Sequence, residues 1–137
     1  MNDVLIPVTM CHELSHLSGY MREDEANFIA FLACLQSDDP EFRYSGVYLA
    51  SVHAMNALLT VDSDLWNQAD ALKSDALRRD IRSNNAYWKQ YETPVSEVSD
   101  RVNDAYLKAN GQENGLRSYG RMVDLLLAYY RDELQWI

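Results

Sequence analysis

The chain has 137 residues, a length that fits a single domain over residues 1–137 with one hydrophobic core. Hydrophobic residues make up 47% and charged residues 24%, proportions that exclude an intrinsically disordered chain. The formal net charge is −9 and no basic stripe is present, so we expect no nucleic-acid partner, because phosphate binding needs clustered cations. No stretch approaches the roughly 20 consecutive apolar residues of a membrane-spanning helix, and the chain as given is expected to be soluble.

The sequence predicts an all-α fold, a compact domain of several helices. Only five glycines and three prolines interrupt the chain, and long stretches space their apolar residues at helical intervals. Few turns are therefore left for a β-rich fold. In chain order, we expect helices over residues 7–19, 23–37 and 40–59, a short helix capped by Ser63, and helices over residues 74–84, 93–110 and 118–136.

Proline, glycine and capping residues set the helix boundaries. Pro7 suits the first turn of the first helix, and Gly19 is the residue type favoured just past a helix C-terminus. Asp39 is the expected N-cap of the third helix, and Thr93 caps the helix that Pro94 opens. The last helix places five residues on one side with the spacing of a core face: Met122, Val123, Leu126, Leu127 and Tyr130.

Two cysteines, Cys11 and Cys34, are too few for a disulfide framework. Each lies in an apolar helical context, where a buried thiol is the commoner state. We therefore expect two thiols, which indicate no particular cellular compartment.

The segment His12-Glu13-Leu14-Ser15-His16 places two histidines four positions apart, with a glutamate directly after the first. Four positions return a helix to within about 40° of the same face, so both imidazoles can reach one ion. Glu13 lies about 100° around the helix from His12, outside the ligand set but near the open side of the metal. The spacing predicts His12 and His16 as zinc ligands and Glu13 as a general base.

A catalytic zinc ion needs a third protein ligand, and the next helix begins with three acidic residues: Glu23, Asp24 and Glu25. Glu23 shares a helix face with the small residues Ala26, Asn27, Ala30 and Cys34, which let two helices approach closely. Glu25 shares its face with bulkier residues that would hold the helices apart. Glu23 is therefore the predicted ligand, and Asn27 is a candidate partner for a ligating imidazole.

This pattern resembles the zinc signature of the gluzincin metallopeptidases. In that clan a second helix supplies a glutamate as third ligand, often in a Glu-x-x-Ala-Asp/Asn context, onto which Glu23, Ala26 and Asn27 map. Asn27 stands where many members have Asp. The resemblance implies that the chain is the helical part of such a peptidase, with the β-sheet that gluzincins place before the first metal helix largely absent.

A second resemblance covers nearly the whole chain and points to the bacterial family catalogued as domain of unknown function 3810. It rests on the segments at residues 11–16, 22–28, 42–46, 102–104, 106–111 and 118–124. The resemblance implies a membrane-anchored peptidase whose transmembrane helices lie upstream of the zinc domain. The chain is then expected to be a C-terminal fragment that reaches the membrane only through those upstream segments.

The expected reaction is hydrolysis of a peptide bond in a peptide or protein substrate. Zinc held by two imidazoles and one carboxylate lowers the pKa of its bound water toward about 7, and Glu13 accepts the proton of that water. The developing oxyanion also needs a donor. The candidates are Tyr44, His53, Tyr106, Tyr119 and Arg121, and we favour Tyr119 and Arg121 because they follow a loop rich in Asn and Gly.

Two other interpretations stay open at this point. The domain could be a catalytically inactive interaction or regulatory part of a membrane protein. The ion could instead be structural, although three protein ligands beside a glutamate suit an open catalytic position better than a closed site of four ligands.

Overall fold

The structure, a computed structural model, describes residues 2–91 and 119–134. Every regular element in these two ranges is helical, which confirms the predicted all-α fold. The elements are a short 3-10 helix η1 (Asp3–Leu5), α1 (Ile6–Leu17), α2 (Glu23–Leu35), α3 (Pro40–Val61), α4 (Ser63–Asp70), α5 (Asp75–Lys89) and α7 (Tyr119–Leu134). The helix predicted over residues 93–110 and the loop after it lie outside the described residues.

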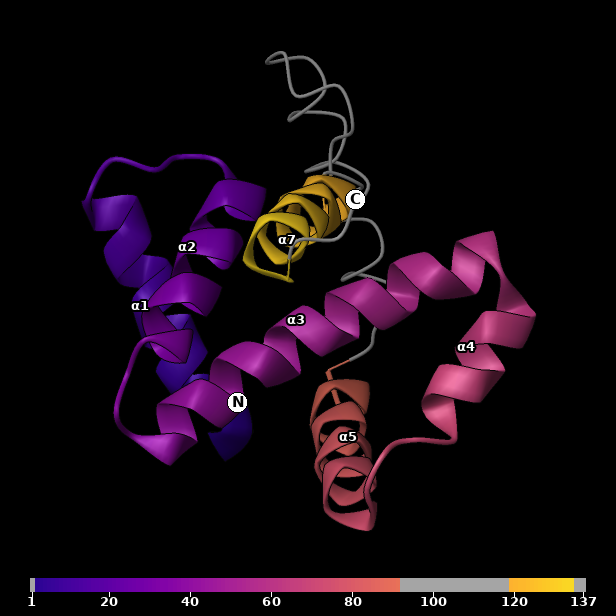
Figure 1. The fold of residues 1–137 in the computed structure, drawn as a ribbon. Helices are drawn as coiled ribbons and strands as arrows, with labels where there is room; N and C mark the ends of the chain where they lie inside the picture. The colour runs from indigo at the N-terminus through magenta and orange to yellow at the C-terminus, as the bar shows by residue number, and fades with distance from the viewer. Residues whose placement is uncertain (1, 92–118, 135–137) are drawn as a thin grey trace.

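The long helix α3 crosses the molecule, and the other helices lie along it (Figure 1). Helices α1 and α2 form an antiparallel pair beside its N-terminal half, and α7 packs against both α2 and α3. Helix α4 lies at the C-terminal end of α3, whereas α5 lies alongside α3, where Asp80 accepts a hydrogen bond from Tyr44. Helices α2 and α3 pack against each other and each also packs against α1 and α7, so together they form the centre of this bundle.

The start of α1 is fixed by a residue from α3. Leu5 stands at the N-cap position and has no side-chain oxygen to offer the first N–H groups. The hydroxyl of Ser45, almost fully buried on α3, accepts a hydrogen bond from the Val8 backbone N–H at 3.0 Å instead. Pro7 in the first turn lacks an N–H and adds no unsatisfied donor. The helix that carries the histidines is thereby anchored to α3.

Small residues on α2 allow its neighbours to approach closely, as the sequence predicted. Ala26, Ala30 and Cys34 are fully buried. On the facing side of α3, a Cβ added at Gly46 would lie 2.6 Å from the Cys34 Cβ and 3.3 Å from the Phe31 carbonyl oxygen. Any larger residue than glycine would push α2 and α3 apart at this crossing.

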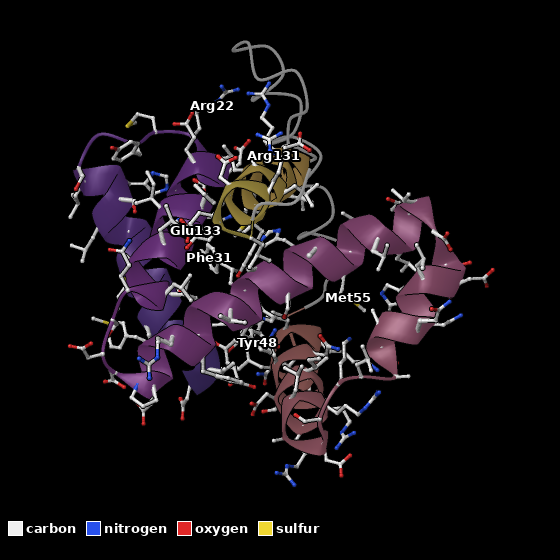
Figure 2. All side chains as sticks on the ribbon, in the orientation of Figure 1. Arg22, Phe31, Tyr48, Met55, Arg131 and Glu133 are labelled. Carbon is white, nitrogen blue, oxygen red and sulfur yellow. The ribbon has the colours of Figure 1, made fainter. Side chains whose placement is uncertain are left out.

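The larger part of the hydrophobic core lies where α2, α3 and α7 meet. Phe31 is fully buried there against Met122 and Leu126 of α7, with Tyr129 and Tyr130 packed around its ring (Figure 2). The predicted core face of the last helix is confirmed for Met122 and Leu126. Tyr130, also predicted, packs against this core while partly buried. The prediction is wrong for Leu127, which is 57% exposed, and Tyr129 packs against the core although it was not predicted to do so.

Several predicted boundaries differ from the structure by about two residues, and two of the differences have a clear physical reason. Asp62, not Ser63, caps α4, because its carboxylate accepts hydrogen bonds from the backbone N–H groups of Asp64 and Leu65, both at 3.0 Å. Both residue types cap helices well, and the extended backbone at Asp62 decides between them. The helix predicted to end at residue 84 continues to Lys89, since its capped start at Ser74 is followed by no helix-breaking residue.

The two cysteines are free thiols whose sulfur atoms lie 3.8 Å apart. The expectation of a buried thiol is confirmed for Cys34, whereas Cys11 is only partly buried. Burial, followed by the neighbouring Cys11, raises the pKa of Cys34 from 9.0 to about 12.

We expect the Cys34 thiol to resist alkylation in the folded protein, because the reactive thiolate is disfavoured and access is blocked. Its raised pKa contributes stability that is complete below about pH 9 and is lost as the pH rises toward 12, since only the unfolded thiol ionises in that window. Iodoacetamide labelling at pH 8, followed by peptide mass spectrometry, should modify Cys34 only after unfolding. Equal labelling in the folded and unfolded protein would contradict this burial.

Among the described helices, none is both long and apolar enough to cross a membrane.

Candidate metal centre

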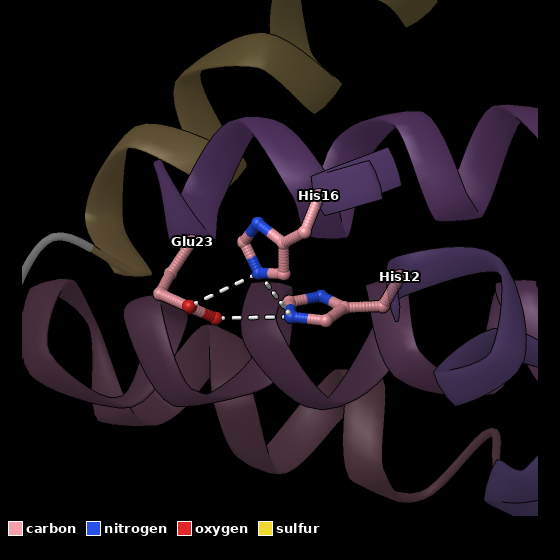
Figure 3. Close-up of side chains that lie close together, drawn as sticks. All are labelled: His12, His16 and Glu23. Atoms are coloured by element: carbon pink, nitrogen blue, oxygen red, sulfur yellow. Dashed lines mark hydrogen bonds and ion pairs between the residues drawn. The ribbon is translucent and has the colours of Figure 1, made fainter. Parts of the chain in front are cut away.

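Three side chains from α1 and α2 converge on one point (Figure 3). The Nε2 atoms of His12 and His16 lie 3.0 Å apart. Glu23 places one carboxylate oxygen 3.0 Å from the His12 Nε2 atom and the other 3.1 Å from the His16 Nε2 atom. Within residues 2–91 and 119–134, no other group of at least three possible metal ligands comes this close together. The structure thus brings together the three residues that the sequence predicted as ligands, and not Asp24 or Glu25.

Hydrogen bonds at the far side of each imidazole orient the rings toward this point. His16 Nδ1 lies 2.7 Å from the backbone carbonyl oxygen of Tyr20, and a carbonyl can only accept. His16 therefore carries a hydrogen on Nδ1, and its Nε2 is the nitrogen that faces the cluster and can act as a ligand. His12 Nδ1 lies 2.7 Å from the Asn27 side-chain oxygen, so the same arrangement holds for His12.

The Tyr20 carbonyl reaches His16 because of the way α1 ends. Gly19 has a φ of +105°, a conformation that side chains with a Cβ rarely adopt. The Gly19 N–H donates to the His16 carbonyl oxygen at 3.0 Å and the Tyr20 N–H donates to the Ser15 carbonyl oxygen at 3.1 Å, which together form a Schellman motif. The turn folds Tyr20 back over the last turn of α1.

The donor set fits a zinc ion. Once both Nδ1 atoms donate, the Nε2 atoms of neutral rings and two carboxylate oxygens point lone pairs at one another, a repulsion that either a cation among them or a proton on an Nε2 atom relieves. Two histidines and one glutamate are a ligand set of catalytic zinc sites, which keep a fourth position open. The Glu23 side chain is 49% exposed, whereas those of His12 and His16 are 14% and 24% exposed, so the cluster is reachable from solvent on the side of Glu23.

Asn27 supports the cluster without belonging to it. The side chain is buried one helical turn after Glu23, and its oxygen accepts from His12. Asn27→Leu keeps a similar volume but removes the acceptor, and we expect it to lower zinc affinity about 10- to 100-fold. Asn27→Asp retains the acceptor and should stay close to the parent. Competition with a zinc-binding dye measures both affinities, and equal affinity for the Leu variant would mean that this hydrogen bond does not orient His12.

A pocket of about 450 Å³ adjoins the cluster. Its polar lining consists of His12, Glu13, Glu23 and Asn27 together with Thr9 and His53. Glu13 is exposed to solvent on α1 and shares this pocket with two of the three clustered residues. Glu13 therefore lies beside the cluster but is not part of it, which is the position that the helical spacing predicts for this residue.

The five candidate donors for an oxyanion lie in different places. His53 on α3 lines the pocket beside the cluster, and burial lowers its pKa. Tyr44 lines a different hollow and donates a hydrogen bond of 2.5 Å to Asp80. Arg121, in the first turn of α7, is not among the described residues that line the pocket of the cluster. Tyr106 and the side chain of Tyr119 lie outside the described residues.

Sequence reasoning missed Trp88, whose half-exposed indole ring lines the same pocket from α5. The predicted helix stopped before this residue. One signal was available, because Trp88 is in phase with Leu77 and Ile81 on a helix and therefore extends their apolar stripe.

Comparison with protein-family models shows which family the chain resembles over most of its length. The model of a family described as "Protein of unknown function (DUF3810)" matches residues 1–127. No curated protein and no solved structure matches the chain. Since the matched range includes α1, α2, α3 and most of α7, and with them the whole cluster, the chain belongs to the DUF3810 family.

Proposed function

We propose that this protein is a zinc-dependent metallopeptidase of the gluzincin type. The observation that carries the proposal is the convergence of four electron-rich atoms from His12, His16 and Glu23 on one point, with both imidazoles held by acceptors at their far nitrogens. A glutamate follows the first histidine and shares a pocket of about 450 Å³ with the cluster. A structural ion would need a fourth protein ligand, and the described residues supply three.

In the proposed reaction, His12, His16 and Glu23 would hold a zinc ion, which would supply a Lewis acid able to make water more acidic near neutral pH. The Glu13 carboxylate accepts the proton of the attacking water and passes it to the amine that leaves when the peptide bond breaks. Glu13 is exposed on the pocket side of α1, where both the water and the leaving group have access to it.

His53 is the oxyanion donor that the pocket favours. It extends from α3 into the lining of the same pocket as His12 and Glu13, and an imidazole can donate an N–H to a carbonyl oxygen that gains negative charge. The earlier preference for Tyr119 and Arg121 stays a prediction, because neither residue is among the described lining residues.

Metal analysis and a peptidase assay test the proposal. The protein is purified without chelators, and zinc is measured by mass spectrometry alongside cleavage of a peptide mixture derived from digested protein. We expect about one zinc per chain and cleavage products that disappear with a chelator and return with added zinc. Stoichiometric zinc without any hydrolysis would favour the alternative of an inactive interaction domain.

Membrane anchoring, which the family resemblance implies, stays a prediction. The prediction is that the protein is found at the membrane in host cells, and it makes no statement about the described helices. Fractionation of host cells, with an antibody against this domain, should place it with the membranes.

A further inference from the structure

The pocket beside the cluster extends along α1. Leu5, Val8, Thr9 and His12 all line it and follow the spacing of one helical face. Leu5 and His12 are seven residues apart, which corresponds to two turns or about 10 Å along the axis. The pocket therefore reaches well beyond the metal ligands, far enough to accept a side chain next to a peptide bond held at the cluster.

The part of the pocket away from the ligands is apolar. Leu5 at the end of η1 and the nearly fully buried Val8 of α1 form one side, Leu49 adds a wall from α3 and Trp88 adds one from α5. The Trp88 ring is 49% exposed and contacts Tyr87 on its own helix and Tyr91 just after the helix ends. Its indole thus offers apolar surface that a ligand in the pocket could cover.

Charge in this pocket disfavours an acidic ligand. Glu13 and Glu23 both line it, and no lysine or arginine is present among its described lining residues. With zinc at the cluster offsetting the Glu23 charge, an acidic side chain would still meet the Glu13 carboxylate in a lining without lysine or arginine, whereas an apolar side chain would bury the surfaces of Leu49 and Trp88.

We propose that Leu5, Val8, Leu49 and Trp88 form a subsite for a large apolar side chain, aromatic or branched aliphatic, on the substrate residue adjoining the scissile bond. The inference rests on the proposed peptidase function and names its substrate class. Glycine in that position leaves the subsite empty, and aspartate or glutamate is rejected.

Two measurements test the subsite separately from catalysis. The first compares kcat/KM for internally quenched peptides that differ in one residue, either Phe, Gly or Asp, beside the cleaved bond. The second measures binding of the same peptides to the Glu13→Gln protein by calorimetry. We expect the Phe peptide to be favoured over the Gly peptide by about 10-fold or more in both measurements, and the Asp peptide to be the poorest.

Trp88→Ala should reduce the preference for Phe over Gly by about 10-fold, with little change for the Gly peptide. Leu65→Ala removes an equally exposed apolar side chain from α4, outside this pocket, and should leave the preference intact. A circular dichroism spectrum equal to that of the parent shows that each variant is folded.

The outcomes separate the subsite from the peptidase. Cleavage of all three peptides at equal rates would overturn the subsite and leave the peptidase standing. Absence of cleavage with a retained, Trp88-dependent binding preference would overturn the peptidase and support the subsite. Absence of both cleavage and preferential binding would overturn both.

Discussion

Glu13→Gln should lower kcat by about 10²- to 10⁴-fold while the protein still binds one zinc ion. The amide keeps the size of the side chain but cannot accept a proton from water at neutral pH. Glu13 is exposed and lies outside the three-residue cluster, so its replacement removes no ligand. Steady-state kinetics with an internally quenched peptide, together with zinc analysis of the same sample, measures both quantities.

Glu25→Gln is the matched control for this variant. It removes the same charge from the first turn of α2, two residues after Glu23, and Glu25 neither joins the cluster nor lines its pocket. Its kcat should equal that of the parent. If Glu13→Gln cleaves as well as Glu25→Gln, Glu13 is not the base, and the glutamate that follows His12 has only a surface role.

The ligand cluster could be predicted because each of its parts is a local pattern. The spacing of His12 and His16 places both on one helix face, and the small residues that follow Glu23 show which face of α2 approaches α1. Asn27 could be inferred in the same way, one turn after Glu23. All of these contacts lie between α1 and α2, which follow each other in the chain. The short connection at Gly19 therefore limits which face of α1 can meet which face of α2.

The rest of the site depends on features that leave no local pattern. The carbonyl of Tyr20 is a backbone group, and only the glycine before it hints at the turn that presents it to His16. Trp88 reaches the pocket from a helix more than sixty residues farther along the chain. Its place there depends on how α5 packs, and periodicity within a single helix cannot predict this.

Zinc should stabilise the folded protein strongly. The three ligands converge only in the fold, so a metal that binds this state and not the unfolded chain adds free energy of unfolding. At a free concentration of about 1,000 times Kd this gain is roughly 4 kcal/mol, which corresponds to a rise in Tm on the order of 10 °C or more. Thermal unfolding followed by circular dichroism, with and without zinc, measures the shift.

His16→Ala should remove most of this shift without lowering the Tm of the metal-free protein by a comparable amount. In the absence of metal the imidazole contributes a hydrogen bond from Nδ1 to the Tyr20 carbonyl oxygen and Nε2 contacts with His12 and Glu23, all partly exposed to solvent, so their loss should cost about 1 kcal/mol, well below the zinc term. A histidine kept for packing would behave in the opposite way, because its loss would destabilise the protein whether or not zinc is present. A His16→Ala variant that keeps the full zinc-dependent rise in Tm would place the ion elsewhere in the chain and leave the convergence of His12, His16 and Glu23 without a metal.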